Sequence, residues 1–322
     1  MKNLTVKTKG QVSMNFLATI LILFILFCML LSPAKFISQA LNGISAWSLN
    51  VLPSILPFMF FTKLLSSLDC MPTITKPFSK VCKKLFKTPP ISAYTFLMAI
   101  LSGYPVGSKM VADLYIQRKI TQEEAFKMTS FCSTSGPMFI VGAVGIGMFK
   151  SSKIGYILFI SHLVGALING IAFRNFKLKS KTETTRNESQ VPTPLQSTSL
   201  SDIITNSTFS ILSVGCIITI FFVVIECFAP LFYLFSPPLS AFFQGTIEIT
   251  KGCFELAQLP YPFLATTLTS FIISFGGIST IVQSVTMLEK VKMPVKLFVF
   301  QKILHATFSC IITVILLFLF GI

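Results

Sequence analysis

Residues 91–117 read ISAYTFLMAILSGYPVGSKMVADLYIQ, an apolar run that is interrupted near its centre by SGYPVGSK. Two glycines, a proline and a lysine occupy positions where a continuous membrane helix carries apolar side chains. A break inside hydrocarbon frees backbone N–H and C=O groups, and leaving one of them unpaired there costs several kcal/mol. The interruption is therefore typical of a segment that protein or water lines inside a membrane protein.

The composition of the 322-residue chain is that of a polytopic membrane protein. It is 53% hydrophobic and 11% charged, with a mean hydropathy of +0.79, whereas an average soluble domain has about 25% charged residues. Since a full span takes about 20 residues, roughly eight to ten spanning or half-spanning segments fit this length. The net charge of +15 lies in short connections between apolar runs. Basic residues in such connections follow the positive-inside rule of membrane proteins. The net charge therefore does not predict that the protein binds nucleic acid.

The first apolar run, residues 14–31, follows three lysines. It is longer than the hydrophobic region of about 7–15 residues in a signal peptide, and no small-residue cleavage site follows it. We therefore expect a retained first membrane helix.

Catalytic and metal-binding patterns are missing from the sequence. The eight cysteines form no CxxC pair and show no metal-ligand spacing. There is also no GxSxG, HExxH or Walker-type motif. We expect neither an enzyme nor a cofactor.

The apolar runs divide into two halves. The expected order is a cytoplasmic N-terminal tail at 1–13, a first membrane half at 14–173, a polar linker at 174–202 and a second membrane half at 203–322. Helices are expected at 14–32, 41–66, 126–149, 154–173, 204–229 and 297–320, with broken segments at 91–117 and 261–288. The predicted fold class is an all-α, polytopic membrane helix bundle of two repeat-like halves with broken or re-entrant helices.

The position of segment 91–117 decides the topology. Basic residues cluster in the connection 76–87, the link 117–127 and the linker 174–186. They all lie on the cytoplasmic side if segment 91–117 is a re-entrant hairpin, and they divide between the two faces if it crosses the bilayer. We favour the hairpin.

A second glycine break, SFGGIST at 274–280, resembles the first. Aligning Ser102 with Ser274 places Gly103-Tyr104-Pro105 opposite Phe275-Gly276-Gly277. Interrupted segments at corresponding positions of two halves are typical of a transporter's binding site. Two unrelated glycine kinks in ordinary membrane helices remain the alternative.

The residues around the first break suit an anion. If Gly107-Ser108 opens a new half-helix, its free N–H groups and positive dipole end face the membrane interior. Lys109 adds a positive charge to that site or extends to the interface, and both readings stay open. The hydroxyls of Ser133-Thr134-Ser135, before Gly136-Pro137, are further candidates. The glycines at 142–147 are better explained by helix packing.

Ionisable residues in apolar segments are functional candidates because they are costly there. Glu248 could belong to a binding site or a proton-coupling site, or could pair with Lys251 near the interface. His162 could relay protons, although a structural hydrogen bond to a backbone carbonyl is the more frequent role. The remaining ionisable residues of these segments are Asp113, Glu226, Glu255 and His305.

These arguments give two sets of candidate residues. The possible proton relay consists of His162 and Glu248. The candidate substrate-binding residues are Ser102, Gly103, Tyr104, Pro105, Gly107, Ser108, Lys109, Ser133, Thr134, Ser135, Gly136, Glu248, Ser274, Gly276, Gly277 and Ser279.

Several motifs occur in an order that resembles a known family. They are LPSILPFMFF, SGYPVGSKM, FCSTSGPMFIVGAVGIGMF followed by SHLVG, and EITKGC with SFGGIS. Over about residues 41–320 the chain is similar to the YlbJ-type sporulation integral membrane proteins, within a wider group that shares a nucleoside recognition, or Gate, domain. The resemblance implies a permease-like protein in the mother-cell-derived outer forespore membrane that moves dipicolinic acid toward the spore.

The leading hypothesis is therefore a carrier for a small organic anion that binds between the two broken segments. The expected partners are the lipid bilayer, a dipicolinate-like anion, other sporulation membrane proteins and a second copy in a homo-oligomer. The alternative is a non-transporting membrane gate or scaffold subunit that acts with a partner protein.

Overall fold

The computed structural model describes residues 9–67, 71–178 and 199–321. Every regular element within these ranges is a helix. Five segments are long and apolar enough to cross a membrane: Pro33–Leu65, Ser152–Phe173, Leu200–Cys227, Pro262–Met287 and Val295–Phe320. The predicted all-α, polytopic helix bundle is confirmed.

The first half contains eight α-helices and two π-helices in its described ranges. In order they are α1 (Lys9–Leu31), α2 (Pro33–Ala46), η1 (Trp47–Val51), α3 (Leu52–Ser66), α4 (Met71–Leu85), α5 (Ile91–Ser102), α6 (Val106–Ile116), α7 (Gln122–Cys132), η2 (Met138–Met148) and α8 (Ser152–Phe173).

The second half begins after the linker, whose residues 179–198 lie outside the described ranges. Its elements are α9 (Leu200–Cys227), α10 (Ala229–Phe232), α11 (Pro237–Ile247), α12 (Ile249–Leu256), α13 (Pro262–Phe275), α14 (Gly277–Met287), η3 (Glu289–Val291) and α15 (Val295–Phe320).

Two elements differ from the sequence-based expectation. The basic connection 76–87 is largely helix α4, whose lysines recur every three or four residues and so share one face. The helix expected at 126–149 is broken, because α7 ends at Cys132 and η2 begins at Met138. Pro137, at the start of η2, has no N–H to continue the ladder of α7.

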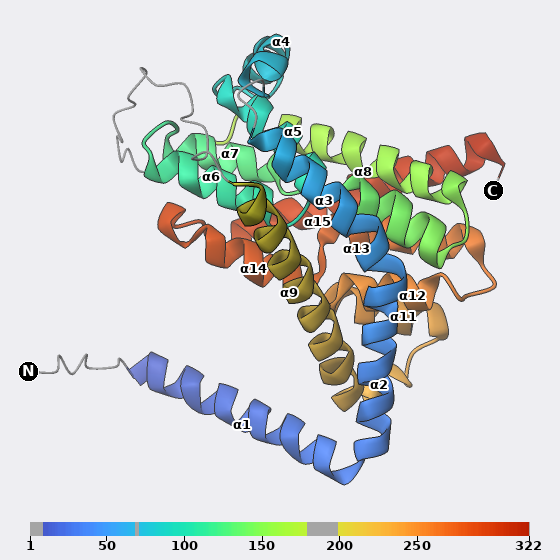
Figure 1. Ribbon diagram of the computed structural model, residues 1–322. Helices are drawn as coiled ribbons and strands as arrows, with labels where there is room; N and C mark the ends of the chain where they lie inside the picture. The colour runs from blue at the N-terminus through green and yellow to red at the C-terminus, as the bar shows by residue number, and fades with distance from the viewer. Residues whose placement is uncertain (1–8, 68–70, 179–198, 322) are drawn as a thin grey trace, which may run out of the picture.

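The elements α2, η1 and α3 form one long rod that packs along α9 (Figure 1). Close approach depends on Gly43, where a Cβ atom would lie 2.9 Å from the Cα of Thr219. At the foot of the rod, Lys35 Nζ lies 2.6 Å from Glu226 Oε1. Helix α1 leaves this foot and runs away from the bundle (Figure 1).

The segment 91–117 forms a helical hairpin, and its re-entry into the membrane stays a prediction. Helices α5 and α6 have 12 and 11 residues, too few for a span, and they pack against each other. Before α5, Lys87 Nζ donates to Asn175 Oδ1 beyond the end of α8, at 2.6 Å. After α6, Gln122 Nε2 donates to the carbonyl oxygen of Val291, at 2.8 Å. Both ends of the hairpin therefore reach the same end of the bundle.

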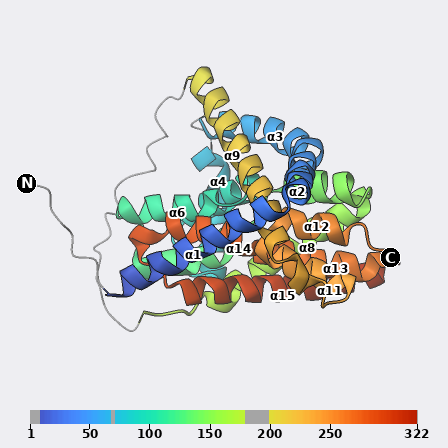
Figure 2. The same ribbon diagram turned by 90° about the horizontal axis from the view of Figure 1, so that it is seen from below.

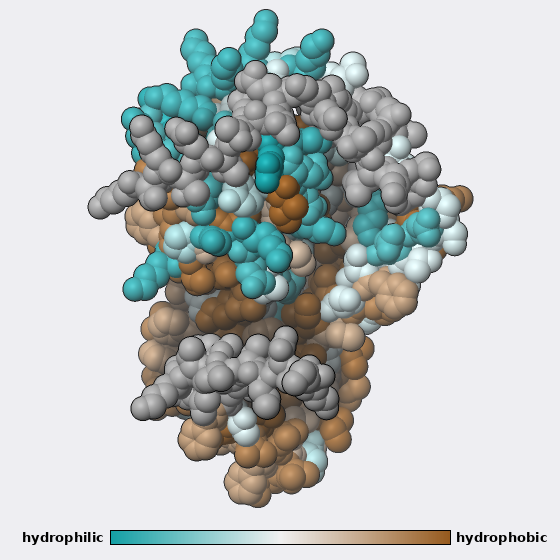
Figure 3. Space-filling view, turned by 90° about the vertical axis from the view of Figure 1, so that its left-hand side faces the viewer, coloured by the Kyte–Doolittle hydropathy of each residue, from teal (hydrophilic) through white to brown (hydrophobic). Residues whose placement is uncertain are grey.

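We call this end of the bundle the basic end. Hydrophilic residues gather on the upper part of the face that looks left in Figure 1, while its lower part is largely hydrophobic (Figure 3). Helix α8 leads from Ser152, at the opposite end, to this one. The basic residues on the elements that meet here are Lys76, Lys80, Lys83, Lys84, Lys87, Arg118, Lys119, Arg174, Lys177, Lys290, Lys292 and Lys296.

Helices α8, α13 and α15 lie side by side in the centre of the bundle (Figures 1 and 2). Gly165 of α8 faces α15 so closely that a Cβ atom would overlap the Oγ of Ser309. Gln301 of α15 donates from Nε2 to the carbonyl oxygen of Phe126, at 2.8 Å, and accepts at Oε1 from Thr129, at 2.9 Å. These contacts fix α15 against the end of α7.

Candidate ligand site where helix breaks meet

The tip of the first hairpin packs on the break between α7 and η2. Gly103 has φ +73°, a left-handed conformation that favours glycine, and a Cβ atom there would lie 2.8 Å from the Gly136 nitrogen. A Cβ atom on Gly107 would overlap the carbonyl oxygen of Cys132. The two breaks thus touch through backbone, which requires glycine at both positions.

Tyr104 extends from the hairpin tip to the break between α13 and α14. Its hydroxyl lies 3.4 Å from the carbonyl oxygens of Ile273 and Ser274. Gly276, with φ +90°, ends α13, and a Cβ atom there would lie 3.5 Å from Tyr104 Cζ. The two glycine breaks that the sequence analysis paired are therefore neighbours in space.

His162 of α8 connects two of the breaks. The Ser135 N–H donates to His162 Nε2 at 2.9 Å, so Nδ1 carries the proton and donates to Ser274 Oγ at 2.8 Å. His305 Nε2 lies 2.9 Å from the carbonyl oxygen of His162, and the two rings are 4.6 Å apart. Both nitrogens of His162 are used in holding the breaks together, and its role as a proton relay stays a prediction.

Lys302 of α15 places its amino group at this junction. Its side chain is buried, and Nζ lies 2.5 Å from the Tyr104 hydroxyl and 2.9 Å from the carbonyl oxygen of Ser133. The same atom lies 4.5 Å from the centre of the Tyr104 ring. Within the described ranges, Lys302 forms no ion pair with a carboxylate. The sequence analysis missed it, although a lysine inside the last apolar run was a usable signal.

Three hydroxyl groups beside the breaks are buried without a hydrogen-bond partner among the described residues. They belong to Ser108 at the start of α6 and to Ser133 and Thr134 after α7. Buried polar groups are nearly always hydrogen-bonded, so each of these needs an explanation. A polar ligand at the junction would supply the missing partners.

Glu248 forms a fourth break, between α11 and α12. Its Oε2 accepts from the backbone N–H of Lys251 at 2.7 Å and so begins α12. The break lies against Gly277, where a Cβ atom would approach the carbonyl oxygen of Ile247 to 3.1 Å. The ammonium of Lys251 pairs with Glu255 at 2.6 Å instead of with the Glu248 side chain.

The structure brings most of the predicted residues to the junction, while Lys109 lies exposed on the outer face of α6. Ser102 and Pro105 are half-buried at the hairpin tip, and Ser279 is buried on α14. The predicted residues that contact another break, or a side chain that holds two breaks together, are Gly103, Tyr104, Gly107, Ser133, Ser135, Gly136, Ser274, Gly276 and Gly277. Glu248 contacts its own break, and its neighbours Ile247 and Ile249 lie against Gly277.

The order of the elements gives a different pairing of the breaks from the one expected. Each half contains a hairpin, then a broken segment, then a long helix: α5–α6, α7–η2 and α8, and later α11–α12, α13–α14 and α15. The counterpart of the 103–105 break is therefore Glu248, and the counterpart of the 133–137 break is Gly276. The sequence supports this pairing of the breaks, because SKMVADL at 108–114 is similar to TKGCFEL at 250–256.

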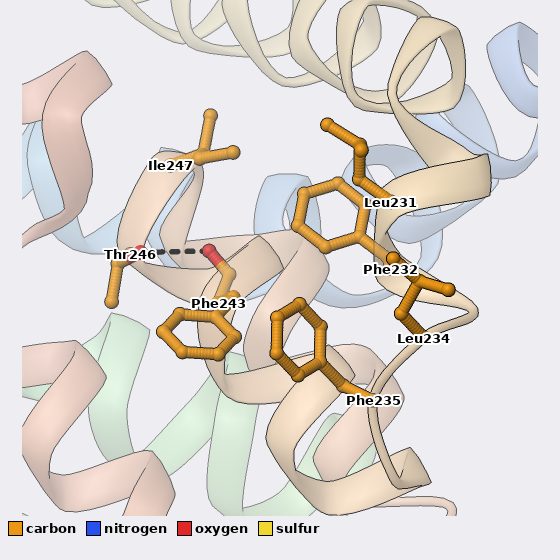
Figure 4. A pocket seen from close by; sticks show the side chains of 7 residues that line it. All are labelled: Leu231, Phe232, Leu234, Phe235, Phe243, Thr246 and Ile247. Atoms are coloured by element: carbon orange, nitrogen blue, oxygen red, sulfur yellow. Dashed lines mark hydrogen bonds between the residues drawn. The ribbon is translucent and has the colours of Figure 1, made fainter.

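An apolar pocket of about 410 Å³ opens elsewhere, between α10 and α11 (Figure 4). The one polar side chain in its lining is Thr246, whose hydroxyl donates to the carbonyl oxygen of Phe243 at 2.7 Å. A pocket without a charge does not suit an anion. The other residues that line it are Leu231, Phe232, Leu234, Phe235 and Ile247.

Comparison with known proteins agrees with the resemblance seen in the motifs. Residues 48–152 match the family model described as Gate, nucleoside recognition. Over 310 residues the chain is 26% identical to the sporulation integral membrane protein YlbJ of Bacillus subtilis (strain 168), covering 85% of this chain and 76% of that protein. No solved structure matches the chain. The Gate match includes Tyr104 and Ser133, while Lys302 lies outside it.

Proposed function

We propose that this chain, a membrane protein of the YlbJ and Gate family, carries a small organic anion through the junction of its helix breaks. One observation carries the proposal: the buried ammonium of Lys302 has no carboxylate partner among the described residues. It lies where the hydroxyls of Ser108, Ser133 and Thr134 also have no partner. An anion with several oxygen atoms would satisfy both requirements.

The charge balance supports an anionic ligand. A lysine at the centre of a membrane helix costs at least about 2.5–3.5 kcal/mol on insertion scales. The carbonyl end of α7 and the face of the Tyr104 ring offset part of this cost. An ammonium has three N–H donors, and two of them point to Tyr104 and Ser133. The third has no acceptor among the described residues, and we propose that a carboxylate of the ligand accepts from it.

The backbone adds a second attraction for negative charge. Helices α6 and α14 both begin at the junction, after Pro105 and Gly276. The first N–H groups of a helix have no intrahelical acceptor and carry its positive dipole end. Half-helices that start near the midplane hold anionic substrates in this way in other carriers.

Dipicolinate is the specific substrate that we propose. Its two carboxylates suit one ammonium, several hydroxyls and two helix starts. The similarity to a sporulation integral membrane protein supports a role in spore formation. Dipicolinate as the cargo and the outer forespore membrane as the location are parts of our proposal. Rocking of the two halves around the junction would alternate access to it.

A second candidate is a membrane gate or scaffold subunit that acts with a partner protein. The observation that favours it is α1, whose N-terminal part runs away from the bundle (Figure 1) and which exposes many large apolar side chains, such as Phe16 at 68% and Leu30 at 80%. Such a helix suits a partner helix in the membrane as well as lipid.

Uptake by purified protein in liposomes separates the two candidates. We expect vesicles that contain the protein to take up labelled dipicolinate faster than empty vesicles, and unlabelled dipicolinate to compete better than benzoate, which has one carboxylate. Uptake equal to that of empty vesicles would contradict transport by the chain alone and favour the second candidate.

A further inference from the structure

We propose that the ammonium of Lys302 takes the place of a coupling cation, so that the protein loads its anion without Na⁺ or K⁺. The inference builds on the proposed function, but it concerns the cation at the junction and can be tested without transport.

The first argument is the position of the ammonium. Carriers with discontinuous helices bind their coupling cations at the carbonyl ends of half-helices and at unwound backbone. Helix α7 ends at Cys132, and the next carbonyl, that of Ser133, accepts from Lys302 Nζ at 2.9 Å. The Tyr104 hydroxyl supplies a second oxygen at 2.5 Å, from the tip of the hairpin. Lys302 thus uses the oxygens that would otherwise bind a free cation.

The second argument is that the ammonium is held in place. Lys302 is 3% exposed. Its neighbour Gln301 is fixed to Phe126 at 2.8 Å, and His305 lies within hydrogen-bond distance of the His162 carbonyl, at 2.9 Å. These bonds on both sides set the rotation and height of α15, so the ammonium cannot withdraw to solvent without breaking them.

The third argument is electrostatic. A free cation at the same oxygens would meet a like charge at close range, in surroundings that screen poorly. Removing the side chain of Lys302 removes this repulsion. The Ser133 carbonyl and the Tyr104 hydroxyl would then face a space without a donor, which is unfavourable for buried acceptors. A small cation that enters this space restores what was lost.

Thermal unfolding in detergent tests the proposal, with N-methylglucamine chloride, NaCl and KCl compared at equal ionic strength. We expect the wild-type midpoint to be the same in the three salts. We expect Lys302→Ala to unfold at a lower temperature in N-methylglucamine and to regain several degrees in NaCl or KCl, because a ligand that binds the folded state raises the midpoint.

Two variants serve as controls. Lys302→Met removes the charge but fills the space, so no alkali cation should stabilise it. Lys296→Ala removes an exposed lysine from the same helix and should behave like the wild type.

The proposal is overturned if Na⁺ or K⁺ stabilises the wild type, or if folded Lys302→Ala responds to neither ion. Should Lys302→Ala fail to fold, Lys302→Ser, which also empties the space, takes its place in the comparison. Because the readout is unfolding, a protein that transports nothing would sink the proposed function and leave this test valid.

Discussion

The Nζ of Lys302 lies 2.9 Å from the carbonyl oxygen of Ser133, although the two residues are 169 positions apart in the chain. The contact joins the last helix to a break in the first half, and Tyr104 brings the hairpin tip to the same ammonium. The site proposed here therefore depends on both halves at once.

Substitutions at the start of α6 should separate Ser108 from Lys109. Ser108 is buried at the junction with an unpartnered hydroxyl, so Ser108→Leu should reduce dipicolinate uptake at least tenfold. Lys109 is exposed, so Lys109→Ala should change uptake less than twofold. Initial rates in liposomes measure both. A tenfold loss in Lys109→Ala would return this residue to the anion site.

His162 should stabilise the folded protein by holding two breaks. His162→Phe keeps an aromatic ring but leaves the Ser135 N–H and the Ser274 hydroxyl without their partner. Each buried group left unsatisfied costs about 1–3 kcal/mol. The variant should unfold at a clearly lower temperature than Ser274→Ala, which loses one bond.

Tyr156 on the same helix provides the control for this comparison. It is exposed, and Tyr156→Phe should leave the unfolding temperature unchanged. Equal stability of His162→Phe and the wild type would show that the imidazole does not hold the breaks.

The glycines at the first two breaks should differ in their tolerance of alanine. A Cβ atom on Gly107 would overlap the Cys132 carbonyl, whereas the nearest atom to a Cβ on Gly136 lies 3.6 Å away. Gly107→Ala should therefore lower the yield of folded protein and its unfolding temperature, while Gly136→Ala should be close to neutral. Similar behaviour of the two variants would contradict the contact between the hairpin tip and α7.

Because both ends of the α5–α6 hairpin reach the basic end of the bundle, we expect the residues of that end to lie on one side of the membrane. Cysteines introduced at Lys83 and Lys290 lie at the basic end, and a cysteine at Ser152 lies at the opposite end of α8. With the protein expressed in the plasma membrane of a host cell, an impermeant thiol reagent applied to intact cells should label Ser152→Cys and spare the other two. Labelling of Lys83→Cys but not Lys290→Cys would mean that the segments between them cross the membrane differently.

The sequence predicted the elements of the site better than their arrangement. The breaks at Gly103 and Gly276 were predicted because glycine, proline and polar residues interrupt apolar runs there. The break of the 126–149 helix at Ser133–Pro137, the break at Glu248 and the helical form of the basic connection were missed, because they depend on how the chain packs.

The local sequence around Lys109 and Lys302 did not predict which of the two lysines reaches the site. Lys109 lies in a conspicuous motif and is exposed, whereas Lys302 lies in an ordinary apolar helix and is buried at the junction. Which lysine reaches the site is decided by contacts between the two halves, which no window of sequence contains. The match between SKMVADL and TKGCFEL was a signal that could have given the correct pairing of the halves.

The most direct test of the account is dipicolinate uptake by liposomes that contain Lys302→Met, with Lys296→Met as the matched control on the same helix. Because Lys302 supplies the cation of the site, we expect Lys302→Met to fold and to transport at least a hundredfold more slowly than the wild type, while Lys296→Met transports normally. Transport by folded Lys302→Met at the wild-type rate would contradict the central claim.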